Sequence, residues 1–262
     1  MIVVKYGGHA LPKAGTPDGI LQIVANYHKS GREILLVHGG GPQVDVELAI
    51  HGIKSEMVNG YRVTTPEIIE VVQAVLAGQV CRTLVNQLVS YGANAVGLSA
   101  TDGGTIRAEI MKPIVNGEAI DIGLVGDIAS TNPAFLKLLI EEKYLPVISP
   151  VAVNSEGQAL NVNGDLAAAA IGGAMRADQV IFMTDVEGIY RNYPDRSSII
   201  NECSAQELRA LQPSFSAGMI PKSKAALLAL NMGARLARVI DGRDPANLIA
   251  ALDGVGGTVV TR

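Results

Sequence analysis

The sequence predicts an α/β protein built around a mainly parallel β-sheet. The main observation is the order of the first elements: an apolar strand at 2–4, an amphipathic helix at 20–30 and a second apolar strand at 34–37. A strand, a helix and a strand in this order form a βαβ unit, whose two strands run parallel. The composition agrees, because the chain holds 29 glycines for many short turns, whereas aromatic residues make up only 4%.

The size and charge of the chain limit its architecture and its partners. With 262 residues it can form one large or two small domains, and 48% hydrophobic residues supply a large core. The net charge of −4 and the lack of a basic tract argue against a nucleic-acid partner. Because Met1 leads directly into a strand and no apolar stretch reaches the ~20 residues of a membrane span, we expect a cytoplasmic protein without a signal peptide or membrane contact. Cys81 and Cys203 lie far apart without metal-ligand spacing, so we expect reduced structural thiols.

Glycine-rich turns follow the first two strands. The second strand runs into Gly39, Gly40 and Gly41, and Pro42 then begins a helix. The backbone can approach an anion closely at such a turn, and the N–H groups at a helix start favour negative charge. The motif is neither a Walker A loop nor Gly-x-Gly-x-x-Gly, and a tight turn without a ligand is the alternative.

The first strand ends in a similar turn, Lys5-Tyr6-Gly7-Gly8. Glycines leave room beside Lys5, whose ammonium could reach a phosphate as a point charge. A solvated surface lysine is the alternative at this position.

A polar, irregular segment is predicted at 54–65. It contains Arg62, and a guanidinium can bind a carboxylate through two parallel hydrogen bonds. A surface salt bridge is the alternative.

A long helix is predicted to begin at Pro66. Thr64 and Glu67 have the spacing of a capping box, with the proline in the first turn. Apolar residues continue at helical spacing to Gly92, so the helix has an apolar face that packs on the sheet or on a partner subunit. A strand at 95–98, a hairpin around Asn116-Gly117, a helix at 132–142 and a strand at 145–149 follow.

The segment Leu160–Asp165 alternates two asparagines and an aspartate. In an extended strand, Asn161, Asn163 and Asp165 point to one side and could hold a ligand. Asp165 could equally cap the alanine-rich helix predicted at 166–175.

Three further strands are predicted, at 179–183, 236–240 and 258–261. The first leads into Thr184–Tyr190, and the carboxyl ends of parallel strands are where such sheets bind ligands. Lys222 lies in the first turn of a helix that begins at Pro221, where a cation opposes the helix dipole. An anion nearby would compensate for this placement.

Taken together, these motifs resemble the amino acid kinase family. The matching stretches keep the family's order over nearly the whole chain, at 4–8, 37–42, 59–64, 160–167, 184–189 and 218–222. The resemblance implies an open αβα sandwich around a mainly parallel sheet of about eight strands. It is greatest to the members that transfer the γ-phosphate of ATP, with Mg²⁺, to the side-chain carboxylate of N-acetyl-L-glutamate in arginine biosynthesis.

The resemblance also implies two lobes with different roles. Residues 1–176 would bind the acylated amino acid and form a homodimer through the long helix, and residues 177–262 would bind ATP. Arginine-inhibited relatives carry an additional N-terminal helix before the first strand. We therefore expect an arginine-insensitive homodimer.

Individual roles follow from the same resemblance. Lys5 and Lys222 would stabilise the transferring phosphoryl group, and Asp165 would orient both lysines. The substrate would contact Gly40, Gly41, Arg62 (through its α-carboxylate), Asn161 and Asn163, and the phosphate would contact Gly7, Gly8 and Gly40. The nucleotide would contact Asp185, Val186, Glu187, Gly188, Ile189 and Tyr190, with Ser214, Phe215 and Ser216. No residue is assigned to a resident metal.

Two other functions stay open at this point. One is a sister kinase of the same family, acting on carrier-protein-bound aminoadipate or glutamate. The other is a catalytically silent sensor of amino acid and nucleotide. Retention of Lys5, Asp165 and Lys222 together argues against the sensor, since binding alone has little need of all three.

Overall fold

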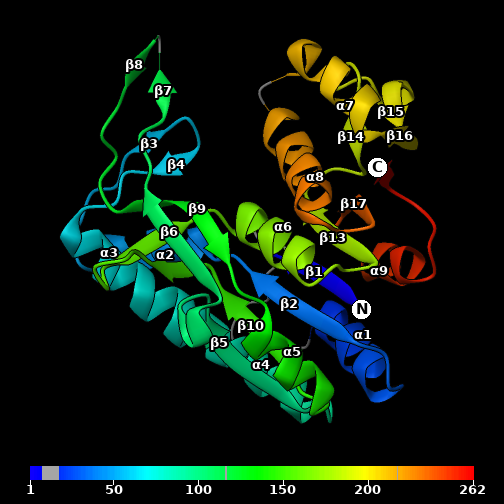
Figure 1. The fold of residues 1–262 in the computed structure, drawn as a ribbon, viewed down its shortest axis with the longest axis horizontal. Coiled ribbons are helices and arrows are strands. Elements are labelled where there is room, and N and C mark those ends of the chain that lie inside the picture. Colours follow the sequence, from blue (N-terminus) through cyan, green and yellow to red (C-terminus); the bar gives the residue numbers. More distant parts are fainter. Residues whose placement is uncertain (8–17, 116, 217) are drawn as a thin grey trace.

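The computed structural model of the protein describes residues 1–7, 18–115, 117–216 and 218–262 (Figure 1). At its centre lies an eight-stranded sheet in the order β16-β18-β17-β13-β1-β2-β10-β5. Its strands are β1 (Ile2–Tyr6), β2 (Ile34–His38), β5 (Ala95–Ser99), β10 (Leu145–Ser149), β13 (Gln179–Thr184), β16 (Glu202–Ser204), β17 (Leu236–Asp241) and β18 (Thr258–Thr261). Neighbouring strands run parallel except β17 and β18. The predicted sheet is confirmed.

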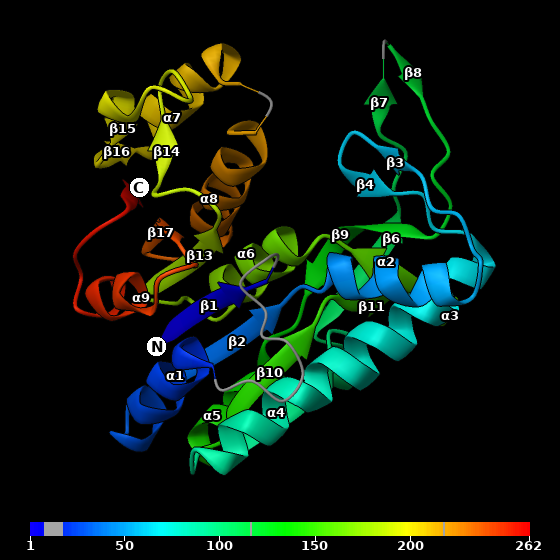
Figure 2. The same cartoon turned by 180° about the vertical axis from the view of Figure 1, so that it is seen from behind.

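Helices cover both faces of this sheet, which suits central strands that are apolar except near their carboxyl ends, at Lys5, His38 and Ser149. Every residue of β2 and of β10 is buried, as expected for strands covered on both sides. On one face α1 contacts α4 and α9 (Figure 2), and on the other α6 packs against α8 (Figure 1). The helices are α1 (Gly19–Lys29), α2 (Gly41–Ile50), α3 (Pro66–Gln73), α4 (Cys81–Ser90), α5 (Ala134–Glu141), α6 (Gly164–Ala174), α7 (Ala205–Leu211), α8 (Ile220–Met232) and α9 (Pro245–Leu252).

The long helix predicted from Pro66 is present, but its cap and its middle differ from the expectation. The N-cap is Thr65, whose hydroxyl accepts from the N–H of Ile68, and not Thr64. A π-helical segment, Ala74–Val80, joins α3 to α4. By length and composition the merged helix could cross a membrane, so the expectation that no apolar stretch is long enough was wrong. Half of its apolar window is buried inside the protein.

A second, smaller group of strands forms a barrel of β6 (Ile106–Ile110), β9 (Val125–Thr131), β11 (Val151–Val153) and β12 (Ala159–Val162). The predicted hairpin around Asn116-Gly117 is present as β7 (Ile114–Val115) and β8 (Glu118–Ala119); Asn116 itself lies outside the described residues.

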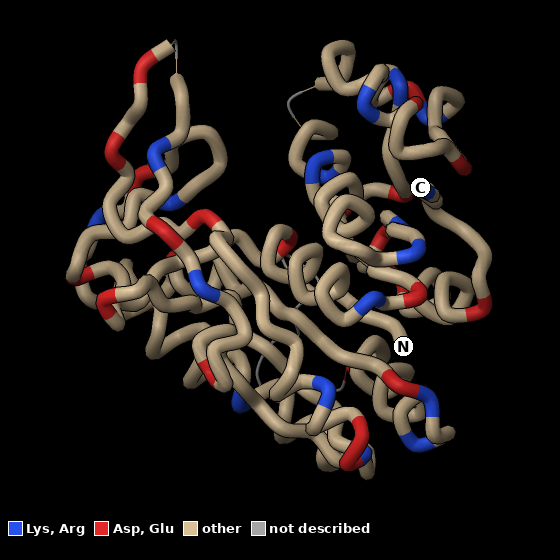
Figure 3. The backbone as a smooth tube through the Cα atoms, in the orientation of Figure 1, with Lys and Arg blue, Asp and Glu red and all other residues tan. Residues whose placement is uncertain are grey.

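Residues 54–65 are more regular than predicted, because β3 (Met57–Val58) and β4 (Tyr61–Arg62) pair as a hairpin. The turn residues Asn59 (φ +49°) and Gly60 (φ +82°) both adopt positive φ, as tight hairpin turns require. This hairpin and β7–β8 rise from the same side of the molecule, and α7, α8 and the pair β14 (Ile189–Tyr190) and β15 (Ile199–Ile200) rise from the other (Figures 1 and 2). Charges of both signs are interspersed along the chain (Figure 3).

Candidate active site

The two glycine-rich turns predicted from the sequence meet at one edge of the sheet. Since β1 and β2 pair in parallel with Tyr6 opposite His38, the turns that follow them lie side by side. The N–H of Gly39 donates to the carbonyl of Tyr6 at 2.9 Å. A Cβ atom on Gly7 would lie 2.9 Å from the nitrogen of Gly39, so a larger residue does not fit there. Gly8 lies outside the described residues.

The start of α2 offers free backbone donors at this edge. Gly40 takes the N-cap position with a φ of +154°, and no side chain of the described residues caps the helix. A Cβ atom on Gly40 would lie 2.6 Å from Cδ2 of Leu76, on the long helix. Uncapped N–H groups at a helix start are suited to an anionic ligand. The contact of Gly40 and Gly41 with substrate or phosphate stays a prediction.

The side chain of Lys5, near the end of β1, extends toward the start of α6. Its Nζ lies 2.9 Å from Oδ1 of Asp165, with the two side chains 14% and 25% exposed. The helix is capped by Asn163, whose Oδ1 accepts from the N–H groups of Asp165 (2.8 Å) and Leu166 (3.1 Å). The alternative that Asp165 caps a helix from residue 166 is therefore wrong. Because Asn163 does the capping, the Asp165 carboxylate is free to face Lys5.

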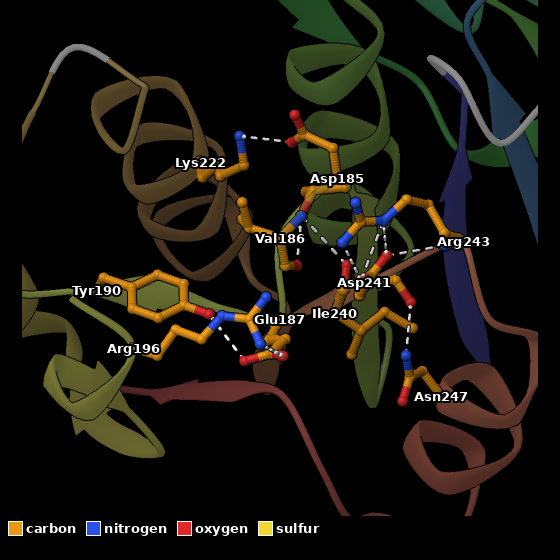
Figure 4. Close-up of polar contacts among 11 residues, drawn as sticks. Asp185, Val186, Glu187, Tyr190, Arg196, Lys222, Ile240, Asp241, Arg243 and Asn247 are labelled. Atoms are coloured by element: carbon orange, nitrogen blue, oxygen red, sulfur yellow. Dashed lines mark hydrogen bonds and ion pairs between the residues drawn. The ribbon is translucent and has the colours of Figure 1, made fainter. Parts of the chain in front are cut away.

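Lys222 approaches from α8 and pairs with a different acid. Its Nζ lies 3.4 Å from Oδ1 of Asp185 and donates to the carbonyl of Gly218 (Figure 4). Within the part of the chain that the structure describes, no ion pair joins Asp165 to Lys222. The reason is topological, since α8 lies over the end of β13, where Asp185 follows. Burial acts to raise the pKa of Asp185, but the Lys222 charge and hydrogen bonds outweigh it and hold that pKa below its usual value.

A cavity of about 200 Å³ adjoins the glycine triplet. The residues expected to bind the acylated amino acid all line it, namely Gly40, Gly41, Arg62, Asn161 and Asn163. Asn161 is held from the side, because its Nδ2 donates to the Thr64 hydroxyl at 3.3 Å. The structure thus brings together residues that are up to 123 positions apart in the sequence, from 40 to 163.

Arg62 is the cation of this cavity, and its side chain is only 9% exposed. Nη1 donates to the Ser55 hydroxyl and lies 2.7 Å from Oδ1 of Asp45, and Nη2 donates to the carbonyl of Gly41. The salt bridge expected as the alternative is present, and because the guanidinium also lines the cavity, its binding of a substrate carboxylate stays a prediction. Asp45 was not predicted from the sequence as a partner of Arg62, although it lies one helical turn after Gly41, on the helix that the triplet begins.

The residues expected to contact the nucleotide lie in two segments: Asp185–Tyr190 follows β13 (Figure 4), and 214–216 lies between α7 and α8. The Tyr190 hydroxyl donates to Glu187 at 2.9 Å, and Arg196 lies 3.7 Å from the same carboxylate. Val186 turns back onto Thr184, whose hydroxyl accepts from its N–H at 3.3 Å.

Some of these residues already have partners in the core. Ile189 is fully buried and its N–H donates to the Thr258 hydroxyl at 2.7 Å. A Cβ atom on Gly188 would lie 2.4 Å from that hydroxyl oxygen. Phe215 is also buried in the core. The Ser214 hydroxyl donates to the Leu211 carbonyl, and the Ser216 carbonyl accepts from the N–H of Met219.

The sequence analysis also missed a polar group beside Asp185. Asp241 lies opposite Thr184 in the sheet, and its carboxylate binds Arg243 at 2.6 Å (Figure 4). Hydrogen bonding to Arg243 lowers the pKa of Asp241 although burial opposes it. Asn247 donates to the Asp241 carbonyl at 3.1 Å. Asp241 could have been predicted, because it directly follows the predicted strand at 236–240, whose carboxyl end lies at the same edge of the sheet.

Comparisons with known proteins agree with this arrangement. The model of the amino acid kinase family matches residues 1–241. An acetylglutamate kinase from Paenarthrobacter aurescens (strain TC1) is 42% identical over 99% of this chain and 86% of its own length. An acetylglutamate kinase from Bifidobacterium adolescentis is 41% identical over 99% of this chain and 83% of its own length.

Two solved structures share the fold. N-acetylglutamate synthase from Neisseria gonorrhoeae has a TM-score of 0.84 at 22% identity, over 100% of this chain and 59% of that chain. Carbamate kinase from Giardia lamblia has a TM-score of 0.69 at 20% identity, over 100% of this chain and 98% of that chain. At these identities the likeness is one of fold.

Proposed function

Because this chain belongs to the amino acid kinase family, we propose that it is an acetylglutamate kinase. It would transfer the γ-phosphate of ATP to the side-chain carboxylate of N-acetyl-L-glutamate, giving N-acetyl-L-glutamyl 5-phosphate for arginine biosynthesis. The observation that carries the proposal is the cavity that the Arg62 guanidinium lines together with the glycines at the uncapped start of α2. Relatives of that name, 42% identical over nearly the whole chain, support it.

The chemistry of the site suits a carboxylate acceptor. Such a group has an ordinary pKa of about 4.3 and is ionised at neutral pH, so it needs no general base. The barrier to transfer lies in aligning two anions and offsetting their repulsion. Lys5 and Lys222 supply positive charge from two sides, and the N–H groups of Gly40 and Gly41 supply preorganised donors.

We assign the acylated amino acid to residues 1–176 and ATP to residues 177–262. All residues that line the cavity beside the triplet belong to the first segment, and Asp185 and Lys222 belong to the second. The nucleotide would enter with Mg²⁺ as its counter-ion. Among the described residues, no group of three or more His, Cys, Asp and Glu side chains could hold a metal.

We further propose a cytoplasmic homodimer. The helix Pro66–Ser90 would form the interface, because its apolar window is only half buried in one chain. Light scattering of the purified protein should give twice the mass of one chain. The mass of a monomer or of a hexamer would contradict this assembly.

The deciding experiment measures ADP release with and without N-acetyl-L-glutamate, and traps the acyl phosphate with hydroxylamine. We expect ADP and hydroxamate to form in equal amounts, only with the acetylated substrate. A panel of glutamate, N-acetylaspartate and carrier-protein-bound glutamate and aminoadipate tests the sister kinase. Turnover restricted to a carrier-bound substrate would replace the proposal with that enzyme. Binding of both ligands without ADP release would replace it with a sensor.

A further inference from the structure

His38 is a buried histidine for which the proposed reaction has no direct use. It is the last residue of β2 and stands directly before the glycine triplet. Its Nδ1 lies 2.8 Å from the carbonyl oxygen of Gly39. A carbonyl only accepts, so Nδ1 carries the hydrogen and donates it. The other ring nitrogen, Nε2, is buried and has no hydrogen-bond partner among the described residues.

Packing alone does not account for a histidine here. A buried acceptor without a partner costs free energy that an apolar side chain of similar size would avoid. The ring cannot act as a cation for phosphate either, since burial lowers the pKa of His38 to about 4. The remaining contribution is the hydrogen bond from Nδ1 to the triplet.

That hydrogen bond controls the direction of a backbone donor. The carbonyl of Gly39 and the N–H of Gly40 belong to one planar trans peptide, so they point in opposite directions. The N–H of Gly40 makes no hydrogen bond to any described residue, and Gly40 lines the substrate cavity. With its carbonyl held by His38, this peptide keeps its free N–H directed away from the histidine.

Three successive glycines need such a restraint, because they have the greatest backbone freedom of any residue. The neighbouring peptides are fixed by the backbone: the N–H of Gly39 donates to Tyr6, and the carbonyl of Gly40 accepts from Val44. Among the residues that the structure describes, only the His38 ring holds the peptide between Gly39 and Gly40.

We propose that His38 is a positioning residue, which holds the Gly39 carbonyl so that the Gly40 N–H meets the transferring phosphoryl group. This inference rests on the proposed kinase activity. Removing the Nδ1 donor should lower kcat and spare the binding of both substrates, because the oriented N–H acts most strongly on charge that develops in the transition state.

Three substitutions separate this role from packing. His38→Asn places an amide nitrogen where Nδ1 stands, His38→Gln places its amide one bond further out, and His38→Leu supplies no donor. We expect kcat to fall about tenfold or more in His38→Leu and His38→Gln, within the range for a lost preorganised donor, and to stay within about threefold in His38→Asn. KM for N-acetyl-L-glutamate should stay within about twofold in all three.

A second readout uses ADP with aluminium fluoride, which mimics the phosphoryl group in transfer. Its affinity should fall in parallel with kcat, whereas the affinity for ADP alone should not change. If His38→Leu does not fold, the comparison of His38→Gln with His38→Asn decides, since both are polar. Equal kcat in those two variants, or full kcat in His38→Leu, would overturn the inference while an active wild type leaves the kinase assignment intact. A wild type without N-acetyl-L-glutamate-dependent turnover would refute both.

Discussion

Lys5 Nζ and Asp165 Oδ1 lie 2.9 Å apart, joining the end of the first strand to the first turn of α6. Both side chains are mostly buried, so their attraction is screened less than that of a surface pair. A Cβ atom on Gly7 would lie 3.4 Å from the same Nζ, which places the ammonium at the glycine-rich turn. An ammonium has three hydrogens, so Lys5 can hold Asp165 and still donate to a phosphate.

Asp165→Asn tests whether this carboxylate positions Lys5. The amide keeps the shape of the side chain but removes the charge that attracts the ammonium. We expect kcat to fall about tenfold or more with little change in melting temperature. Steady-state kinetics and thermal unfolding check this, with the exposed Asp253→Asn as the matched control. An unchanged kcat would remove Asp165 from the site.

Lys5→Ala and Lys222→Ala should each lower kcat by roughly 10²-fold or more, on the scale of losing one preorganised donor. Lys224 lies on the same helix as Lys222 and is exposed, so Lys224→Ala serves as the control and should keep full activity. Single-turnover measurements with saturating substrates separate the transfer step from product release. Near-wild-type transfer in either of the first two variants would exclude that lysine from the mechanism.

The sequence could predict those residues of the site that lie at the ends of strands. Lys5 and the glycine triplet follow apolar strands, and parallel pairing of those strands brings the two turns together. Local periodicity does not specify which side chains meet across the sheet. The partner of Lys222 depends on α8 lying over β13, so the expected pairing with Asp165 gave way to Asp185.

Helix caps were uncertain for a related reason. Two helices each have two residues near their start that could cap them. These are Thr64 and Thr65 for α3, and Asn163 and Asp165 for α6. Tertiary contacts decide between them. Thr64 is buried and bonded to Asn161, which leaves Thr65 to cap α3.

Arg62→Ala should mainly raise KM for N-acetyl-L-glutamate, because the guanidinium would bind a carboxylate remote from the transferred phosphate. A hydrogen bond to a charged group is worth about 1.5–3 kcal/mol, which corresponds to a rise of roughly 10- to 100-fold. Lys54→Ala removes an exposed cation from the same segment and should leave KM unchanged. An Arg62→Ala enzyme with wild-type KM would contradict the assignment.

Asp45→Asn tests whether Asp45 competes with the substrate for Arg62. Asp45 is 62% exposed and lies 2.7 Å from the guanidinium, so a substrate carboxylate meets a cation that is already paired. Because solvent screens the exposed Asp45 carboxylate, we take the pair to be worth about 0.2–1 kcal/mol although Arg62 is buried. We therefore expect KM to fall by up to about fivefold with kcat unchanged. Glu47→Gln, on the same helix, is the control. A raised KM would show instead that Asp45 holds Arg62 in place.

The buried His38 should make the folded protein sensitive to mild acid. Burial lowers its pKa from 6.5 to about 4, so between these values the unfolded chain binds a proton that the folded protein excludes. The free energy of unfolding that depends on a neutral His38 is fully present above pH 6.5 and is lost as the pH falls toward 4. Between pH 7.5 and 4.5 the unfolding free energy should therefore drop by about 2–3 kcal/mol more in the wild type than in His38→Asn. Urea unfolding at both pH values measures this difference, and His51→Asn, at an exposed position, controls for loss of an imidazole. Equal drops in the wild type and His38→Asn would show that His38 is protonated as readily in the folded protein as in the unfolded chain.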